Sequence, residues 1–390
     1  MVPFEPTQLA QRFQNLRDPR IDRTRRHEFI DLMMIAICGV LCGADNFVEM
    51  ERFARSHSDW FATFLSLPAG IPTHDTLARL FARLDPVTLS STLNEWTRAS
   101  LENPDRFDQS DGFDTIAVDG KCLRASFDKA SGSKALHLIS AWSTRYNLVL
   151  AQQRIEDKSN EITAVAPMLD QIDIEGATVT LDALNTQKDI AQYLRGRDAH
   201  YVLALKLNHP RLLGDVTGFF DRAAQRGFWT DQGEPLPHGS LSTRNNDHGR
   251  LETRIYTCAP APPWLEGLDE WRDMATIVRV ERIRQIGPNI TTETAYYISS
   301  LPLVPSKLAK AIRSHWSIEN SLHWVLDIAF DEDRSRTRKQ HAGENMASLR
   351  RFTLALLKAE QTAKVGINAK RKMAGWDENY RAKLIMQLCN

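Results

Sequence analysis

The stretch TIAVD (Thr115–Asp119) decides the fold class, together with a second stretch, TVTLD (Thr178–Asp182). Each is a short run of β-branched and apolar residues ending on an aspartate, which is typical of a buried strand. A carboxylate at the end of such a strand is costly unless a positive charge pairs with it. If the strands are neighbours, their carboxylates repel each other unless a cation lies between them. Either aspartate alone would be interpreted as a turn residue.

Similar strand patterns surround these two stretches. They are ALHLISAWS (135–143), NLVLAQQRI (147–155) and HYVLALKL (200–207), and helical patterns occur near 160–172 and 186–195. Three strands followed by helix, strand, helix and strand predict a mixed α/β sheet with flanking helices, in the order of an RNase H-like core. Apolar runs at 250–258, 274–286 and 292–301, separated by Pro- and Gly-rich stretches, predict a β-rich insertion in that core.

The remaining sequence is predicted to be helical. Helices are expected near 28–42 and 47–64, and a third follows Thr73 as its N-cap. Two of these helices could form a DNA-reading helix-turn-helix, although any small helical bundle shows the same pattern. The predicted domains are a helical N-terminal domain with DNA-end binding (1–105), the first part of the catalytic core (106–212), the β-rich insertion (213–305), a core helix (306–333) and a basic helical tail (334–390).

Composition bounds the class of protein. The 390 residues carry 49 basic and 49 acidic side chains, but residues 334–390 hold 13 Lys plus Arg against 4 Asp plus Glu. A basic C-terminal region suits a phosphate-rich partner, although basic helices are often only solvated. Five scattered cysteines and no secretory signal favour a reducing cytoplasm. The apolar stretch 29–43 is too short to span a bilayer, so no membrane partner is expected.

A third acidic residue comes from the segment IRSHWSIENSLHWVLDIAF (312–330). Spacing of four places a polar line on one face of the predicted helix, formed by His315, Glu319, His323 and Asp327. Apolar residues surround this line, so a helix packed on the sheet would present it to the two strand-end aspartates. The alternative is a surface helix with its charges in water.

Three such carboxylates suit phosphodiester chemistry. Two divalent ions can activate water or a 3′-hydroxyl and stabilise the leaving oxygen. Hard oxygen ligands select Mg²⁺ or Mn²⁺. We therefore predict Asp119, Asp182 and Glu319 as catalytic residues that bind two Mg²⁺ (or Mn²⁺) ions.

Four motifs, read together, resemble a known family. They are DGKCLR (119–124), LDALNTQ (181–187), HGRLETR (248–254) and HWSIENSLHWVLDIAFDED (315–333). In this order they resemble the DDE transposases of bacterial insertion sequences, in the branch of the H-repeat-associated proteins, and the similarity covers nearly the whole chain. The resemblance implies an RNase H-like catalytic domain, a β insertion before the catalytic glutamate, and the triad Asp119, Asp182 and Glu319.

The resemblance also implies a reaction and its partners. Water would first attack the phosphodiester at the element end, and the freed 3′-hydroxyl would then attack target DNA. The partners would be double-stranded DNA and a second copy of the chain, since two ends must be paired, and the protein would associate with the nucleoid. The predicted DNA contacts are Lys121, Arg124, Lys206, Asn208, Arg313, His315, His323, Arg334, Arg336, Arg338, Lys370, Arg371 and Lys372.

The chain departs from the family pattern at several positions. Related transposases often carry Tyr, Arg and Lys around the catalytic glutamate, where this chain has Ile312, His315 and Leu326. Arg313 and His323 are the candidates to replace the missing phosphate contacts. Leu207 and His209 stand where the branch commonly has Gly and Gln.

Two other functions remain open from the sequence. A metal-dependent nuclease could use His315, Glu319 and His323 as ligands at helical spacing, but it would leave both aspartates unexplained. A catalytically silent, transposon-derived DNA-binding protein could retain the same residues. Dependence on Mg²⁺ or Mn²⁺, and release of cut or joined DNA, distinguish these functions from a transposase.

Overall fold

The fold is described from a computed structural model of the chain. The structure describes residues 13, 15–101, 114–127, 132, 134–155, 161–247 and 249–386. The predicted boundary at 105/106 and His248 of the third motif lie outside these residues. The chain forms two compact units: the first comprises Met1–Asp111, Gly120–Asn160 and Glu319–Asn390, and the second comprises Gly112–Asp119 and Glu161–Ile318. The five predicted domain ranges remain a prediction.

The second unit is built on a mixed sheet. The first half of β1 (Thr115–Leu123) is parallel to β4 (Thr178–Leu181), which is parallel to β5 (His200–Leu205). The helices α7 (Glu161–Leu169) and α8 (Lys188–Gly196) precede and follow β4. Parallel strands need such crossover helices because a tight turn cannot connect them.

Four long antiparallel strands continue this sheet beyond β5. The order is β1-β4-β5-β9-β8-β7-β6, so β9 pairs directly with β5. The insertion is therefore an extension of the core sheet. The four strands are β6 (Gly239–Asp247), β7 (Arg250–Pro260), β8 (Thr276–Ile286) and β9 (Asn289–Ser299).

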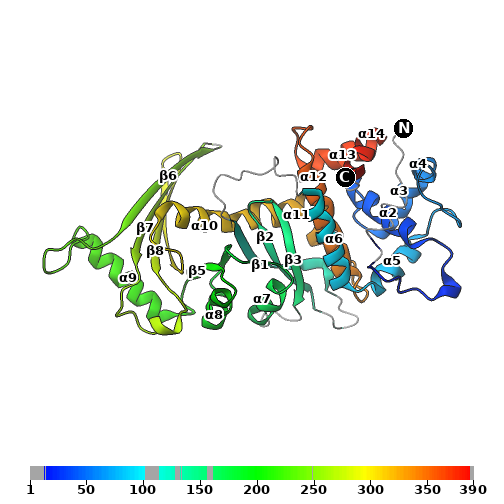
Figure 1. Ribbon diagram of the computed structural model, residues 1–390. Helices are drawn as coiled ribbons and strands as arrows, with labels where there is room; N and C mark the ends of the chain where they lie inside the picture. The colour runs from blue at the N-terminus through cyan, green and yellow to red at the C-terminus, as the bar shows by residue number, and fades with distance from the viewer. Residues whose placement is uncertain are drawn as a thin grey trace. The chain divides into compact units, whose positions relative to one another are not determined.

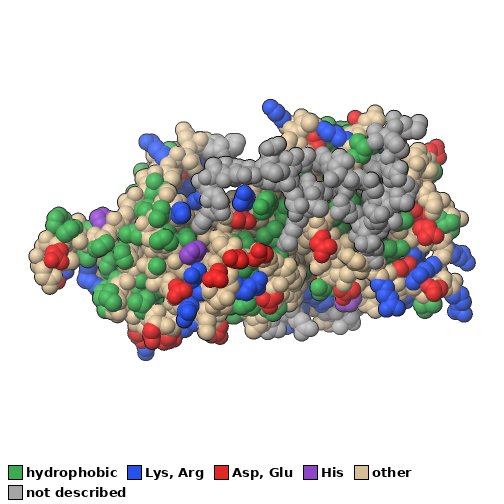
Figure 2. Space-filling view, in the orientation of Figure 1, with side chains coloured by type: hydrophobic (Ala, Val, Ile, Leu, Met, Phe, Trp, Pro, Cys, Tyr) green, Lys and Arg blue, Asp and Glu red, His purple; other side chains and the backbone are tan. Residues whose placement is uncertain are grey.

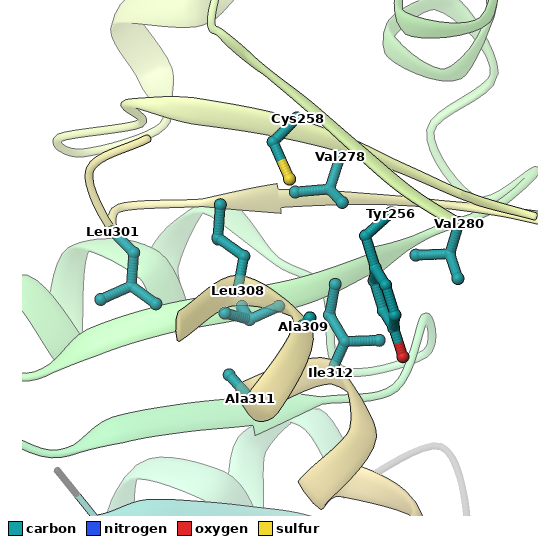
Figure 3. Close-up of a cluster of buried hydrophobic side chains, with 10 residues drawn as sticks. Tyr256, Cys258, Val278, Val280, Leu301, Leu308, Ala309, Ala311 and Ile312 are labelled. Atoms are coloured by element: carbon teal, nitrogen blue, oxygen red, sulfur yellow. The ribbon is translucent and has the colours of Figure 1, made fainter. Parts of the chain in front are cut away.

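Two helices cover opposite faces of this extension (Figure 1). Phe220 of α9 (Pro210–Gln225) lies under the Arg279 guanidinium, on one face of β8. The neighbouring residues Val278 and Val280 point to the other face, because side chains alternate along a strand. There they pack against α10 (Pro305–Ile318), whose Leu308 and Ile312 are buried (Figure 3). This packing fixes the position of α10 on the second unit.

The first unit is mainly helical. Its helix α12 (Ala342–Ala359) is buried along nearly its whole length and packs against α6 (Pro86–Leu101) and the hairpin strand β3 (Leu148–Ile155) (Figure 1). In this unit β2 (Leu136–Ser143) lies between β3 and β1. The other helices of this unit are α2 (Phe29–Leu41), α3 (Phe47–Ser56), α4 (Ser58–Ala62), α5 (His74–Arg83), α11 (Trp324–Phe330), α13 (Ile367–Trp376) and α14 (Glu378–Met386).

These elements confirm the predicted fold class. Three strands precede helix, strand, helix and strand, as expected for an RNase H-like core with a β-rich insertion, and helices come before it. Thr73 is the N-cap of α5, where its side chain accepts a hydrogen bond from the backbone N–H of Thr76. Among the described residues, no helix has both the length and the apolar character needed to cross a membrane.

Three local features differ from the sequence prediction. Helix α9 opens the segment predicted as β-rich, since Leu212, Val216 and Phe220 are spaced by four and share one buried face. Strand β6 was not predicted, because it is rich in Ser, Thr and Asn; it forms as an edge strand paired with β7 along its whole length. The helix predicted over 306–330 is interrupted by a π turn at Glu319–His323.

The segment predicted as a basic tail is also different. Its α12 lies in the core of the first unit, where Arg350 and Arg351 are buried. Arg351 pairs with the buried Glu332 at 2.8 Å, and Arg350 donates to the carbonyl oxygen of Asp45 at 3.1 Å. The basic count of this region therefore overstates the charge that it presents to a partner.

Candidate active site

Asp119 and Asp182 occupy equivalent positions on neighbouring strands. Val118 of β1 is in register with Leu181 of β4, and each aspartate is the next residue of its chain segment. Adjacent strands lie about 4.8 Å apart, so the two aspartates are side by side at this edge of the second unit. Both side chains are half-buried. The register of β1 and β4 therefore places the two strand-end aspartates next to each other, as the sequence predicts.

The turn that follows Asp182 is held by its own motif. The backbone N–H and the side-chain amide of Asn185 both donate to the Asp182 carboxylate, at 3.1 and 3.0 Å. The same amide also donates to the buried Glu161 at 2.8 Å. Thr186 donates through its hydroxyl to the carbonyl oxygen of Asp182 at 3.0 Å. These contacts fix the Asp182 carboxylate through neutral donors that lie within four residues of it.

Helix α10 reaches the strand that carries Asp182. The ring nitrogen Nδ1 of His315 is 3.0 Å from the hydroxyl of Thr180. Thr180 lies two residues before Asp182 and is in register with Ala117, two residues before Asp119. Because side chains two apart on a strand share a face, α10 packs on the face to which Asp119 belongs. His315 is half-buried, and this contact connects α10 with β4.

Glu319 begins a π turn in the first unit. Its carboxylate is 3.7 Å from Nδ1 of His323, and its side chain is 55% exposed while that of His323 is 6% exposed. The two side chains offer an oxygen and a nitrogen close enough together to share one metal ion. Residues four apart are neighbours on one face of a helix, which brings these two side chains together.

A buried charge network lies behind this turn. Nζ of Lys121, on β1, donates to the carbonyl oxygen of His323 at 3.1 Å and to Asp327 at 2.5 Å, and it lies 3.5 Å from Glu332. Burial alone would raise the pKa of Glu332, but the positive charges of Arg351, Lys121 and Arg350 hold this pKa at about 2. Glu332 therefore stays ionised inside the fold.

The predicted DNA contacts divide by exposure. The exposed ones are Arg124, Lys206, Asn208, Arg313, Arg334, Arg336, Arg338 and Lys372. Four are buried: Lys121 and His323 belong to the turn just described, Lys370 donates to the carbonyl oxygen of Leu357 at 2.9 Å, and Arg371 donates to Asp45 at 2.9 Å. Their charged or polar groups make contacts inside the first unit and do not reach the surface, so the structure does not support these four as DNA contacts.

The exposed arginines of segment 334–339 line a cavity of about 530 Å³ in the first unit. The start of α3, from Asn46 to Glu49, also lines this cavity, together with the acidic residues Asp45 and Asp331. On the face drawn in Figure 2, acidic and basic side chains are interspersed over the described surface. A local basic segment is therefore a better indicator of a phosphate-binding surface than overall charge.

Sequence reasoning missed two residues that support the site. Asn185 was quoted within a motif but not assigned a role, although an Asn three residues after a strand-end aspartate commonly bonds back to it. Lys358, on α12, donates to the carbonyl oxygen of Ser321 at 2.8 Å. Its contact spans 37 residues, and no local pattern in the sequence indicates it.

Comparison with known proteins places the chain in a family. A model of the transposase DDE domain matches residues 111–357, and a model of the region associated with that domain matches residues 10–97. The strand-end aspartates, the mixed sheet and this match define the class. The chain belongs to the DDE transposase family.

Two relatives show which branch of the family the chain resembles. The H repeat-associated putative transposase YhhI of Escherichia coli K12 is 32% identical over 98% of each chain. The putative transposase YncI of Escherichia coli O157:H7 is 33% identical over 91% of this chain and 88% of its own. The resemblance to the H-repeat-associated branch is thereby confirmed.

Among solved structures, a piggyBac transposase synaptic complex with hairpin DNA aligns with a TM-score of 0.41 and 12% identity, covering 97% of this chain and 77% of that one. A similarity at this level carries no argument about fold or function.

Proposed function

We propose that this chain cleaves DNA at the ends of an insertion sequence and joins the freed ends to target DNA. Asp119, Asp182 and Glu319 are its catalytic carboxylates. The observation that carries the proposal is the register of β1 and β4, which sets Asp119 beside Asp182. Two adjacent strand-end carboxylates have no structural reason to be paired, because their charges repel each other. A shared cation removes that repulsion.

The path of α10 supports Glu319 as the third member. Along its length α10 contacts β6 and β7, then β5, then β4. His315 contacts Thr180 on β4, and Glu319 follows one turn later. The motif that contains Glu319 therefore begins on the helix that packs against β4.

Chain connectivity also supports Glu319 as the third member. Asp119 is two residues before Lys121, and Lys121 donates to the carbonyl oxygen of His323, inside the π turn that Glu319 begins. An extended strand spans only about 3.3 Å per residue. The connection between Asp119 and Lys121 is therefore short.

The donor set fits divalent metal ions. Carboxylate oxygens suit Mg²⁺ or Mn²⁺, and the neighbouring His323 ring favours Mn²⁺ over Mg²⁺. Bound there, two ions would activate water or a 3′-hydroxyl and stabilise the leaving oxygen. The chain itself supplies negative charge at fixed positions: Asn185 orients the Asp182 carboxylate, and the π turn orients Glu319 beside His323.

Double-stranded DNA is the proposed substrate and partner. The exposed residues Arg334, Arg336 and Arg338 line the cavity in the first unit, where a phosphate backbone would neutralise them. The exposed Arg79 and Arg83 of α5 offer a second basic face in the N-terminal region. Pairing of two DNA ends requires at least a dimer when DNA is bound, and a DNA-bound enzyme would associate with the nucleoid.

The test is a cleavage assay on the DNA that flanks the gene of this protein, with and without Mg²⁺. We expect cut and joined products with the metal, and a loss on the order of 1,000-fold in Asp182→Asn, since loss of a metal ligand costs several kcal/mol of transition-state stabilisation. Leu184→Ala, on the exposed side of the same turn, is the control.

Three outcomes would contradict the proposal. Asp182→Asn that cuts as fast as wild type would remove the catalytic assignment. Cutting of any DNA without joining would indicate a metal-dependent nuclease. Binding without cutting would indicate a silent DNA-binding protein.

A further inference from the structure

The π turn at Glu319–His323 leaves backbone groups that need partners. A π turn closes its hydrogen bonds over five residues, one more than an α-helix, and such turns are frequent at functional sites. The widened backbone has less regular hydrogen bonding than the helices beside it, so its carbonyl oxygens are open to side-chain donors. Two carbonyl oxygens of this turn accept hydrogen bonds from lysines, those of Ser321 and His323.

The two lysines come from different elements of the first unit. Lys121 lies on β1 and donates to the carbonyl oxygen of His323. Lys358 lies on α12 and donates to the carbonyl oxygen of Ser321, and its Nζ is 4.3 Å from the centroid of the Trp142 ring on β2. The turn is therefore attached to a strand and to the central helix of the unit.

Neither lysine is placed where a lysine is expected. Lys121 is 8% exposed and depends on Asp327 and Glu332 for compensating charge. Burial lowers the pKa of Lys358 to about 7, against 10.5 for an ordinary lysine. The Lys121 side chain is buried and that of Lys358 is half-buried, and desolvation of an amine is costly, so a Met or Leu of similar size would fill either place at lower cost. What the two amines have in common is that each donates to a carbonyl oxygen of the same π turn.

We propose that Lys121 and Lys358 are positioning residues, which hold the π turn so that the Glu319 carboxylate and the His323 ring stay in coordinating geometry. This inference rests on the proposed function, in which Glu319 is a metal ligand. In this role neither lysine needs to contact DNA or the metal. Each acts through a backbone carbonyl oxygen of the turn. Lys358 binds that of Ser321, two residues after Glu319, and Lys121 binds that of His323, the last residue of the turn.

Hydrogen exchange of the metal-free, full-length protein tests this role without DNA or catalysis. In Lys358→Met we expect the amides of 319–327 to exchange about tenfold faster, the equivalent of one lost hydrogen bond, while other segments of the first unit are unchanged. Lys358→Arg keeps a donor and should restore most of the protection. Lys364→Met, which removes an exposed lysine beyond α12, is the matched control.

A second measurement connects the turn to the metal. Titration with Mn²⁺, followed by electron paramagnetic resonance, should show a Kd 10- to 100-fold higher in Lys358→Met, as for other residues that orient a metal ligand. Lys121→Met should act in the same direction. Lys121 also compensates the negative charge of Glu332, so Lys121→Met can unfold the protein. Lys358→Met is therefore the primary test.

The outcomes separate this inference from the proposed function. A folded Lys358→Met protein whose 319–327 amides exchange at the wild-type rate would overturn the positioning role, even if wild type cleaves DNA. A wild-type protein that binds no Mn²⁺ would contradict the proposed function, and the exchange comparison would still decide whether the lysines hold the turn.

Discussion

Asp182 and Glu319 are held in different ways. The Asp182 carboxylate is fixed by Asn185, three residues away, through neutral donors in one turn. The turn that carries Glu319 is held by two lysines that are distant in the sequence. Lys121 lies 202 residues before the carbonyl group to which it donates, and Lys358 lies 37 residues after its own acceptor. In the first arrangement the donors to the carboxylate are local, although the same Asn185 amide is also buried against Glu161 of α7. The second exists only after the first unit has assembled, because its donors come from β1 and α12.

The difference has an energetic consequence. Hydrogen bonds from a neutral donor to a half-buried carboxylate contribute about 1.5 kcal/mol each. A buried ionic network costs much more to disrupt, since removal of one partner leaves the others as uncompensated buried charges. Damage near Glu319 should therefore affect folding, whereas damage near Asp182 should affect the site.

The largest expected effect comes from Glu332→Gln. This change removes the buried negative charge that Lys121 and Arg351 share. We expect a loss of about 3 kcal/mol in the free energy of unfolding at pH 7, measured by urea denaturation, from a pKa lowered from 4.5 to about 2. Glu266→Gln, whose carboxylate is 57% exposed beside the 81% exposed Arg211, is the control and should change stability little.

The pH dependence of this effect has a definite sign. The pKa of Glu332 is lower in the folded state, so its contribution is complete above about pH 4.5 and is lost as pH falls toward 2. The difference between wild type and Glu332→Gln should therefore shrink over that window. A difference that is constant from pH 7 to pH 3 would show that the charge of Glu332 is not its source.

Asn185→Ala should have a smaller effect on folding and a larger one on the site. The Asp182 carboxylate loses the side-chain amide but keeps the backbone N–H. We expect the Kd for Mn²⁺ to rise 10- to 100-fold, with cleavage falling in step, and the protein to remain folded. Leu184→Ala in the same turn should leave both unchanged. An equal loss of Mn²⁺ affinity in the two variants would mean that any change in the turn weakens metal binding, and that the Asn185 amide has no specific role.

The sequence is sufficient for the local arrangement and insufficient for the distant one. The strand-end positions of Asp119 and Asp182 could be predicted because each ends an apolar run, and the succession of strands and helices followed from the spacing of such runs. Glu319 could be predicted from helical spacing, but the π turn could not, since it changes the register of the helix without changing its polarity. The sequence predicts Lys121 and Lys370 as DNA contacts because it does not distinguish a buried lysine from an exposed one.

The central claim is that Asp119, Asp182 and Glu319 bind the same divalent ions. The most direct measurement is Mn²⁺ binding to the full-length protein by electron paramagnetic resonance, comparing wild type with Asp119→Asn, Asp182→Asn and Glu319→Gln. We predict that wild type binds Mn²⁺ and that each substitution weakens binding on the order of 100-fold or more. Unchanged Mn²⁺ binding in a folded Glu319→Gln protein would contradict the account.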